Sequence, residues 1–417
     1  MPTTTPGTPA CCSEFGRVSR RGFLRGTLAM AGATTVIGSA VVSASPASAT
    51  SAEAVLVVLS MRGAADGLSL VVPYGDPAYY AARPRIGVPS DSLLEKDGFF
   101  GFHPRLAPLM PLWRAREMAT VQAAGLPVVN RSHFSAMEEL EDARPGATTR
   151  VGWLNRLVGT TAGDSPLQGF HVGGGVVPTA LFGPRPVMAS GDLSAVRIPG
   201  DDQWDKKNGR KRSLRTLWNS DRSTLGTGMR DTFAAIDDFE PVTETQDNRS
   251  RYPDTDLAKG LSAAARVIRG DVGVEVLTID QGDWDMHSGL GTLEWGQMNR
   301  KAEEFAGAVA AFFDDLGSQR SKVTLLAFSE FGRRVAENSN YGLDHGYGNA
   351  MWVFGAGVKG GQHHGSFPDL STGFDADVTV TTDYRDVLAD VVASRFNASI
   401  PTVFPGLSRK TVGIMNA

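Results

Sequence analysis

Three short runs of apolar, mostly β-branched residues constrain the fold of this chain most strongly. They cover residues 55–59, 274–279 and 323–328, and each is followed by a polar loop. Continuous apolar runs of this length are typical of strands buried on both faces, as in parallel sheets. The sequence therefore predicts three buried strands in an α/β fold.

A helix is predicted between the second and third runs. Apolar residues recur at three- and four-residue steps from Trp295 to Leu316, and Gly317 follows as a helix C-cap. Strand, helix and strand over about 55 residues form a βαβ unit, whose two strands are parallel in one sheet. A further strand is predicted over residues 350–354, and further helices over residues 257–269 and 384–395.

Residues 200–256 are much more polar than the rest of the chain. This composition predicts an insertion or lid on the sheet rather than a second core domain. Five basic residues lie between positions 206 and 212. They form either an anion-binding patch or a solvated loop, and the acidic residues beside them favour the loop.

The N-terminal residues 1–49 have the three zones of an export signal. Arg20 and Arg21 precede an apolar run over residues 28–42, which ends in the small-residue sequence Ala47-Ser48-Ala49. Adjacent arginines are typical of twin-arginine signals, and the run is too short for a membrane-spanning helix. We therefore expect the twin-arginine export machinery to recognise this segment. Residues 50–417 would then form a single secreted, periplasmic or otherwise extracytoplasmic domain.

Charge and cysteine content exclude several function classes. The formal net charge of −4 argues against nucleic-acid binding, which needs a basic surface. Both cysteines, Cys11 and Cys12, lie within the predicted signal, so the remaining chain has no disulfide and no thiolate ligand. An oxidoreductase is not expected either, because no Gly-x-Gly-x-x-Gly fingerprint follows the first strand.

Polar residues collect just after the predicted strands, where open α/β sheets bind their ligands. They are Arg62 and Asp66 after the first strand, Asp280, Asp283, Asp285 and His287 after the second, Glu330 and Arg333 after the third, and Asp344 and His345 beyond. Each alone also has a plain structural interpretation, such as a turn cap or an ion pair. Together they predict a shared cleft for Zn²⁺, Mn²⁺ or a harder, oxygen-preferring cation such as Ca²⁺.

Residues 130–138 are predicted to lead from a loop into a helix, with Ser135 and Glu138 as a capping box. Ser132 would precede the helix N-terminus, where free N–H groups and the helix dipole favour an anion such as a phosphate or sulfate ester. The alternative is that Asn130 and Ser132 only cap the helix. This stretch alone does not decide between the two.

Several of these stretches resemble the bacterial family called domain of unknown function 1501. They are residues 61–67, 72–80, 130–134, 282–287, 328–333 and 344–349, and the resemblance runs from about residue 54 to the C-terminus. The family typically has Gly-Gly-Asn where this chain has Gly63-Ala64-Ala65. It also has Gly-Gly-Trp in place of Gly282-Asp283-Trp284, so Asp283 is not expected to be a shared ligand.

That family is similar to a branch of the alkaline phosphatase and sulfatase superfamily. The resemblance implies an α/β/α sandwich with one or two divalent metals and a nucleophile at a helix N-terminus. It implies Ser132 as nucleophile, Arg62 or Arg333 as a ligand for substrate oxygens, and Asp66, Asp285, His287, Glu330 and His345 as metal ligands. Because Glu330-Phe331 replaces an Asp-His dipeptide, one metal site loses an imidazole, while the other keeps Asp285, His287 and His345.

We therefore expect an exported α/β/α sandwich with a mostly parallel central sheet, similar to alkaline phosphatase. Its expected activity is metal-dependent hydrolysis or transfer on phosphate or sulfate esters of a small molecule or a polymer. The alternative is a non-catalytic exported binding or assembly protein that keeps the fold, which the Glu330-Phe331 replacement favours. The substrate, the metal and the oligomeric state do not follow from the sequence.

Overall fold

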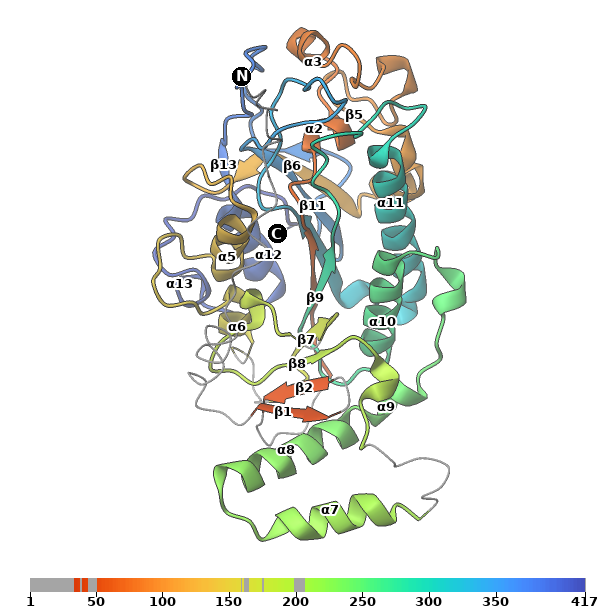
Figure 1. The fold of residues 1–417 in the computed structure, drawn as a ribbon, viewed down its shortest axis with the longest axis vertical. Coiled ribbons are helices and arrows are strands. Elements are labelled where there is room, and N and C mark those ends of the chain that lie inside the picture. The colour runs from red at the N-terminus through yellow and green to blue at the C-terminus, as the bar shows by residue number, and fades with distance from the viewer. Residues whose placement is uncertain are drawn as a thin grey trace, which may run out of the picture.

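A mostly parallel sheet of eleven strands forms the centre of the molecule (Figure 1). The computed structural model describes residues 34–37, 40–43, 51–158, 160, 165–174, 176–198 and 207–416. The strands follow the order β1-β2-β8-β7-β9-β3-β10-β11-β6-β12, and β13 also pairs with β6. Their bounds are β1 Thr34–Ile37, β2 Ala40–Ser43, β3 Val55–Met61, β6 Met118–Gly125, β7 Gly169–Val172, β8 Met188–Ser190, β9 Val276–Gln281, β10 Val323–Phe328, β11 Asn349–Gly355, β12 His363–His364 and β13 Thr382–Asp383.

The three predicted apolar strands lie next to one another as β9, β3 and β10. Strand β3 pairs in parallel with β9 on one side and with β10 on the other. Every residue of β3 and β10 is buried, as expected for strands covered on both faces. The parallel βαβ unit is thus confirmed, with β3 inserted between its two strands. The predicted strand at residues 350–354 is β11, which runs antiparallel to β10.

Helices cover both faces of the sheet (Figure 1). One layer contains α10 Asp256–Arg269 and α11 Gln297–Asp315, and the other contains α5 His133–Asp142, α6 Trp153–Leu157, α12 Tyr384–Arg395 and α13 Ile400–Val403. Alternate residues of β3 point to opposite faces. Val57 and Leu59 therefore belong to the core cluster that includes α10 and α11, whereas Leu56 and Val58 belong to the cluster that includes α5 and α12.

Short elements make up the remaining described structure. The other helices are α2 Gly67–Leu70, α3 Pro77–Ala82, α4 Met110–Arg114, α7 Gly209–Asn219, α8 Thr224–Asp238 and α9 Glu240–Glu244. The 3-10 turns are η2 Ser90–Ser92, η3 Pro104–Leu109, η4 Thr179–Leu181, η5 Leu193–Ala195, η6 Arg249–Arg251 and η7 Gly317–Lys322. Strands β4 Val71–Val72 and β5 Gly101–Phe102 form a separate antiparallel pair.

The predicted helices are present, and one of them begins later than expected. Helix α12 has the predicted bounds, and α10 begins one residue before its prediction. Helix α11 begins at Gln297, so Trp295 lies in the preceding loop. Gly296 has a φ of 128°, which no helical residue adopts, and it therefore blocks an earlier helix start. Gly317 follows the helix end with a φ of 55°, as predicted for a C-terminal cap.

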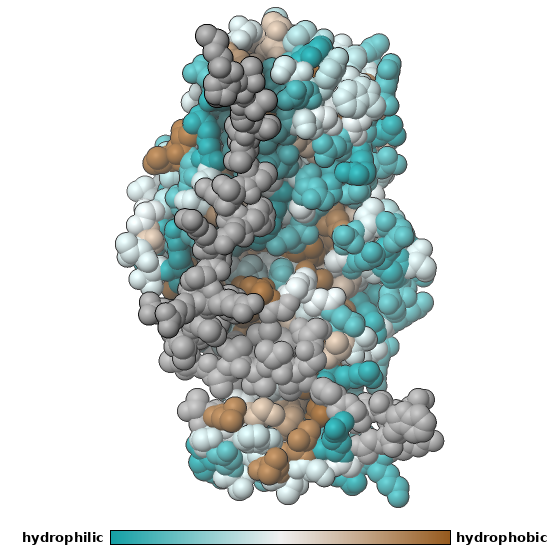
Figure 2. Space-filling model, viewed as in Figure 1, coloured by the Kyte–Doolittle hydropathy of each residue, from teal (hydrophilic) through white to brown (hydrophobic). Residues whose placement is uncertain are grey.

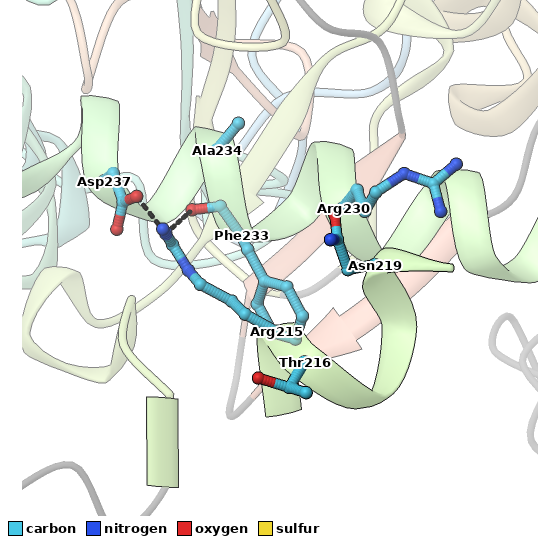
Figure 3. Close-up of a pocket in the computed structure, with 7 residues that line it drawn as sticks. All are labelled: Arg215, Thr216, Asn219, Arg230, Phe233, Ala234 and Asp237. Carbon is cyan, nitrogen blue, oxygen red and sulfur yellow. Dashed lines mark hydrogen bonds and ion pairs between the residues drawn. The ribbon is translucent and has the colours of Figure 1, made fainter. Parts of the chain in front are cut away.

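The basic run, predicted as a solvated loop, leads into helix α7 at Gly209, and the polar stretch continues through α8 and α9. Helix α8 contacts β1 and β2 at one edge of the sheet, and α7 packs on α8 (Figure 1). An open groove of about 340 Å³ lies between them, where Arg215 reaches Asp237 and the carbonyl group of Phe233 (Figure 3). Hydrophobic residues also gather on the surface over this helix pair (Figure 2). These helices therefore extend the sheet edge at β1 instead of covering its centre.

Most of the predicted signal lies outside the described residues, including Arg20, Arg21 and the Ala47–Ala49 sequence. The export prediction therefore stays a prediction. Among the described residues, no helix combines the length and the apolar character needed to cross a membrane.

Candidate metal centre

Four loops meet beyond the carboxyl ends of the central strands. The N–H group of Trp284, after β9, donates to the carbonyl group of Arg62, after β3. The N–H group of Gly346, before β11, donates to the carbonyl group of Gly332, after β10. These backbone hydrogen bonds fix the loops relative to one another, so that their side chains converge on one place.

Three ligand-type side chains converge there, namely His133, Asp285 and His345, whose ligand atoms all lie within 4.8 Å of one another. The Nε2 atoms of His133 and His345 are 2.9 Å apart. The Asp285 carboxylate lies 3.3 Å from His345 Nε2 and 3.5 Å from His133 Nε2. His287 adjoins this group, because its Nε2 lies 2.9 Å from His345 Nε2 and 3.1 Å from Asp285 Oδ1. We call these four residues the histidine cluster.

The second ring nitrogen of each histidine faces an oxygen atom. His133 Nδ1 lies 2.7 Å from Glu330 Oε1, and His287 Nδ1 lies 3.2 Å from Asp344 Oδ1. His345 Nδ1 lies 3.0 Å from the carbonyl oxygen of Arg131. Carboxylate and carbonyl oxygens only accept, so each Nδ1 must carry the proton. Each neutral imidazole then directs an Nε2 lone pair toward the others.

This arrangement fits a divalent metal. Lone pairs 2.9 Å apart repel unless a proton or a cation lies between them. Imidazole nitrogens whose other N–H donates to an oxygen, together with a carboxylate, are the usual ligands of catalytic zinc. Calcium prefers oxygen ligands, so three nitrogen atoms argue against it. The donor set therefore favours zinc or another transition metal.

The charges of the cluster agree with cation binding. Burial alone would raise the pKa of Asp285, but hydrogen bonds from the histidines and Arg333 hold it well below its usual range. Burial alone would lower the pKa of His133, but hydrogen bonds with Asp285 and Glu330 raise it to about 9. The site thus attracts positive charge, which a proton supplies when metal is absent.

Arg333 and Glu330 are buried residues that contact the histidine cluster. The Arg333 side chain is only 1% exposed and donates to Asp285 Oδ1 at 2.6 Å. It also donates to the carbonyl oxygens of Ala64 and Leu343, so it holds Asp285 in place instead of facing a substrate. Glu330 is buried, accepts the Gly63 N–H and orients His133. Burial would raise the pKa of Glu330, but its hydrogen bond with His133 lowers it.

Asp66 and Arg62 were predicted to join this site, but the structure places them in other ion pairs. Both oxygens of the buried Asp66 carboxylate accept from Arg83, at 2.5 and 3.0 Å. Arg62 pairs with Asp280 at 2.8 Å and with Glu141 at 2.7 Å. Asp66 is therefore held in a buried ion pair and Arg62 contacts two carboxylates, and neither belongs to the group of ligand-type side chains.

Ser132 is the N-cap residue of α5 and directly precedes His133. Its side chain is exposed and makes no capping hydrogen bond. The helix begins three residues before the predicted capping box, so Ser135 lies inside it and accepts from Asn130. Ser132 thus stands at the helix N-terminus, next to His133 in the chain, and its hydroxyl group has no capping role.

His133 is the site residue that the sequence-based prediction missed. It lies in the stretch used to select Ser132, one position further on. Two sequence features could have pointed to it: the chain has only seven histidines, and this one directly follows Ser132, the residue considered as nucleophile. Asp344, which orients His287, was noted in its motif but given no role.

Comparison with known proteins adds one family. The family model described as "Protein of unknown function (DUF1501)" matches residues 99–394. A comparison with curated proteins found no match. One similar solved structure, titled "Crystal structure of Ps i-CgsB", is 10% identical over 85% of this chain and 74% of that chain, with a TM-score of 0.30. A TM-score this low supports no inference about fold or function.

Proposed function

Given that this chain belongs to the DUF1501 family of proteins of unknown function, we propose that it is a metal-dependent hydrolase or transferase of the alkaline phosphatase type that acts on phosphate or sulfate esters. One observation carries the proposal. The Nε2 atoms of His133 and His287 both lie 2.9 Å from that of His345, with the Asp285 carboxylate beside them. A cation-binding site of this kind at the carboxyl ends of parallel strands is a suitable place for catalysis.

His133, Asp285 and His345 would hold the metal, with His287 as the neighbouring fourth ligand. The metal would supply positive charge to stabilise the ester group as negative charge develops on it. Ser132 is the proposed nucleophile, since its hydroxyl group stands at the N-terminus of the ten-residue helix α5. The free N–H groups and the dipole of that helix favour an anion there.

The Ser132→Ala variant tests this assignment. With 4-nitrophenyl phosphate and 4-nitrophenyl sulfate as substrates, we expect kcat to fall on the order of a thousandfold or more, because the attacking oxygen is lost. The free energy of unfolding should change by less than about 0.5 kcal/mol, since the hydroxyl group caps nothing. Ser135→Ala is the matched control, one turn away, and should keep full activity. Unchanged hydrolysis in Ser132→Ala would rule out Ser132 as the nucleophile.

A second candidate function is a non-catalytic exported binding or assembly protein that keeps the fold. The observation that favours it is that the described residues contain one group of three ligand-type side chains, whereas enzymes of the alkaline phosphatase superfamily, which the family resembles, can hold two metals. Full metal loading with no turnover of either substrate would support this candidate.

A further inference from the structure

A long open groove runs along the outer face of α11, on the sheet face opposite to α5. Its volume is about 610 Å³, and its lining extends from Gly296 to Gly307. With a rise of about 1.5 Å per helical residue, that face is about 16 Å long. Arg105 and Pro253, which come from other parts of the chain, also line the groove. The volume is typical of sites that hold organic ligands.

Trp295 lines the groove with an exposed indole ring. Its side chain is 48% exposed, although large apolar side chains are usually buried. Its ring packs edge-on against Tyr341 at 5.4 Å, and its carbonyl group accepts from the N–H of Thr292 at 2.7 Å. A Cβ on Gly296 would lie 2.2 Å from the carbonyl oxygen of Leu290, so the loop requires glycine there. The chain therefore builds a tight loop that presents this indole to solvent.

The wall of the groove carries paired charges. Arg105 lies 3.6 Å from Glu303, and Arg300 lies 3.9 Å from Glu304. The side chains of Arg105, Glu303 and Arg300 stay largely exposed and accessible to a ligand, whereas Glu304 is also held by Lys301 at 3.1 Å. With Glu294 also present, two cations face three carboxylates. The near balance of charge favours a neutral ligand over a strongly charged one.

We propose that this groove binds a neutral oligosaccharide. The apolar C–H face of a sugar ring packs on an exposed indole, and the guanidinium and carboxylate groups can exchange hydrogen bonds with its hydroxyl groups. An extended peptide fits less well. The backbone groups of α11 are used within the helix, so the groove offers no strand edge to pair with a peptide backbone. This binding function does not depend on the proposed ester chemistry.

The test is titration of the purified full-length chain with maltohexaose, cellohexaose, xylohexaose and N-acetylated chitohexaose, followed by indole fluorescence and calorimetry. We expect saturable binding of at least one of them. Trp295→Ala should weaken that binding at least about tenfold without changing the melting temperature, and Trp295→Phe should restore part of it. Arg300→Ala, which removes only an exposed side chain, should weaken it severalfold.

Phe374→Ala is the control, because Phe374 is an exposed aromatic residue that does not line the groove. It should bind like the wild type. Absence of saturable binding to all four sugars would overturn the proposal, as would equal affinity in Trp295→Ala. An uncharged hexapeptide that binds in a Trp295-dependent way, where the sugars fail, would assign the groove to peptides instead.

Discussion

The Arg83→Met variant is expected to lose about 3 to 5 kcal/mol of unfolding free energy, the largest change among the variants considered. The Arg83 and Asp66 side chains are 0% and 2% exposed, and they share two hydrogen bonds. Burial alone would lower the pKa of Arg83, but the Asp66 charge raises it. Methionine fills much of the same space and leaves the Asp66 carboxylate buried without its partner. Urea denaturation measures the loss.

Two further variants identify the cause. Replacing both partners, as Arg83→Met with Asp66→Leu, should recover part of the stability, because no unpaired charge stays buried. Arg114→Met removes an exposed ion pair with Glu95 and should cost less than about 0.5 kcal/mol. An Arg83→Met variant as stable as the wild type would contradict this account of the buried ion pair.

The second large effect concerns the histidine cluster. A metal there joins the loop at Asp285 to the loop at His345 and to the start of α5 at His133. A ligand present at 100 times its dissociation constant adds about 2.7 kcal/mol to the stability of the folded state. Chelation should therefore lower the melting temperature of the wild type. His345→Ala should show the same decrease and then be insensitive to the chelator.

The control for this effect is His364→Ala. His364 lies outside the cluster and bonds the carbonyl group of Lys359. This variant should respond to the chelator as the wild type does. If the metal-saturated wild type and the chelator-treated wild type had equal melting temperatures, no ion would join these loops.

The parallel core was predictable because its signals are local. The burial of β3, β9 and β10 follows from continuous apolar runs, and the period of α11 follows from its own side chains. Strand order is not local. Strand β6, which leads into α5, lies beyond β11 in the sheet. The sequence of the loop between β6 and α5 contains nothing that places His133 beside His345.

Asp66 is a second residue whose role could not be predicted from the local sequence. Its position after the first strand agrees with a metal ligand, but a guanidinium group 17 residues along the chain pairs with both of its oxygens. Only the fold shows that Arg83 is buried at that point. Trp295 fitted the helical period, but the backbone of Gly296 excluded it from α11. The ion pair with Arg83 determines the role of Asp66, and the backbone conformation of Gly296 determines where α11 begins. Neither effect produces a periodic sequence pattern.

Metal content tests the central claim most directly. The full-length chain, purified in folded form, loaded with zinc and freed of excess metal, should hold about one equivalent of zinc. His364→Ala should match it, whereas His133→Ala, which removes the ligand found only in the structure, should hold a small fraction of that amount. A folded wild-type chain without bound zinc, or a His133→Ala variant that keeps a full equivalent, would contradict the proposed metal centre.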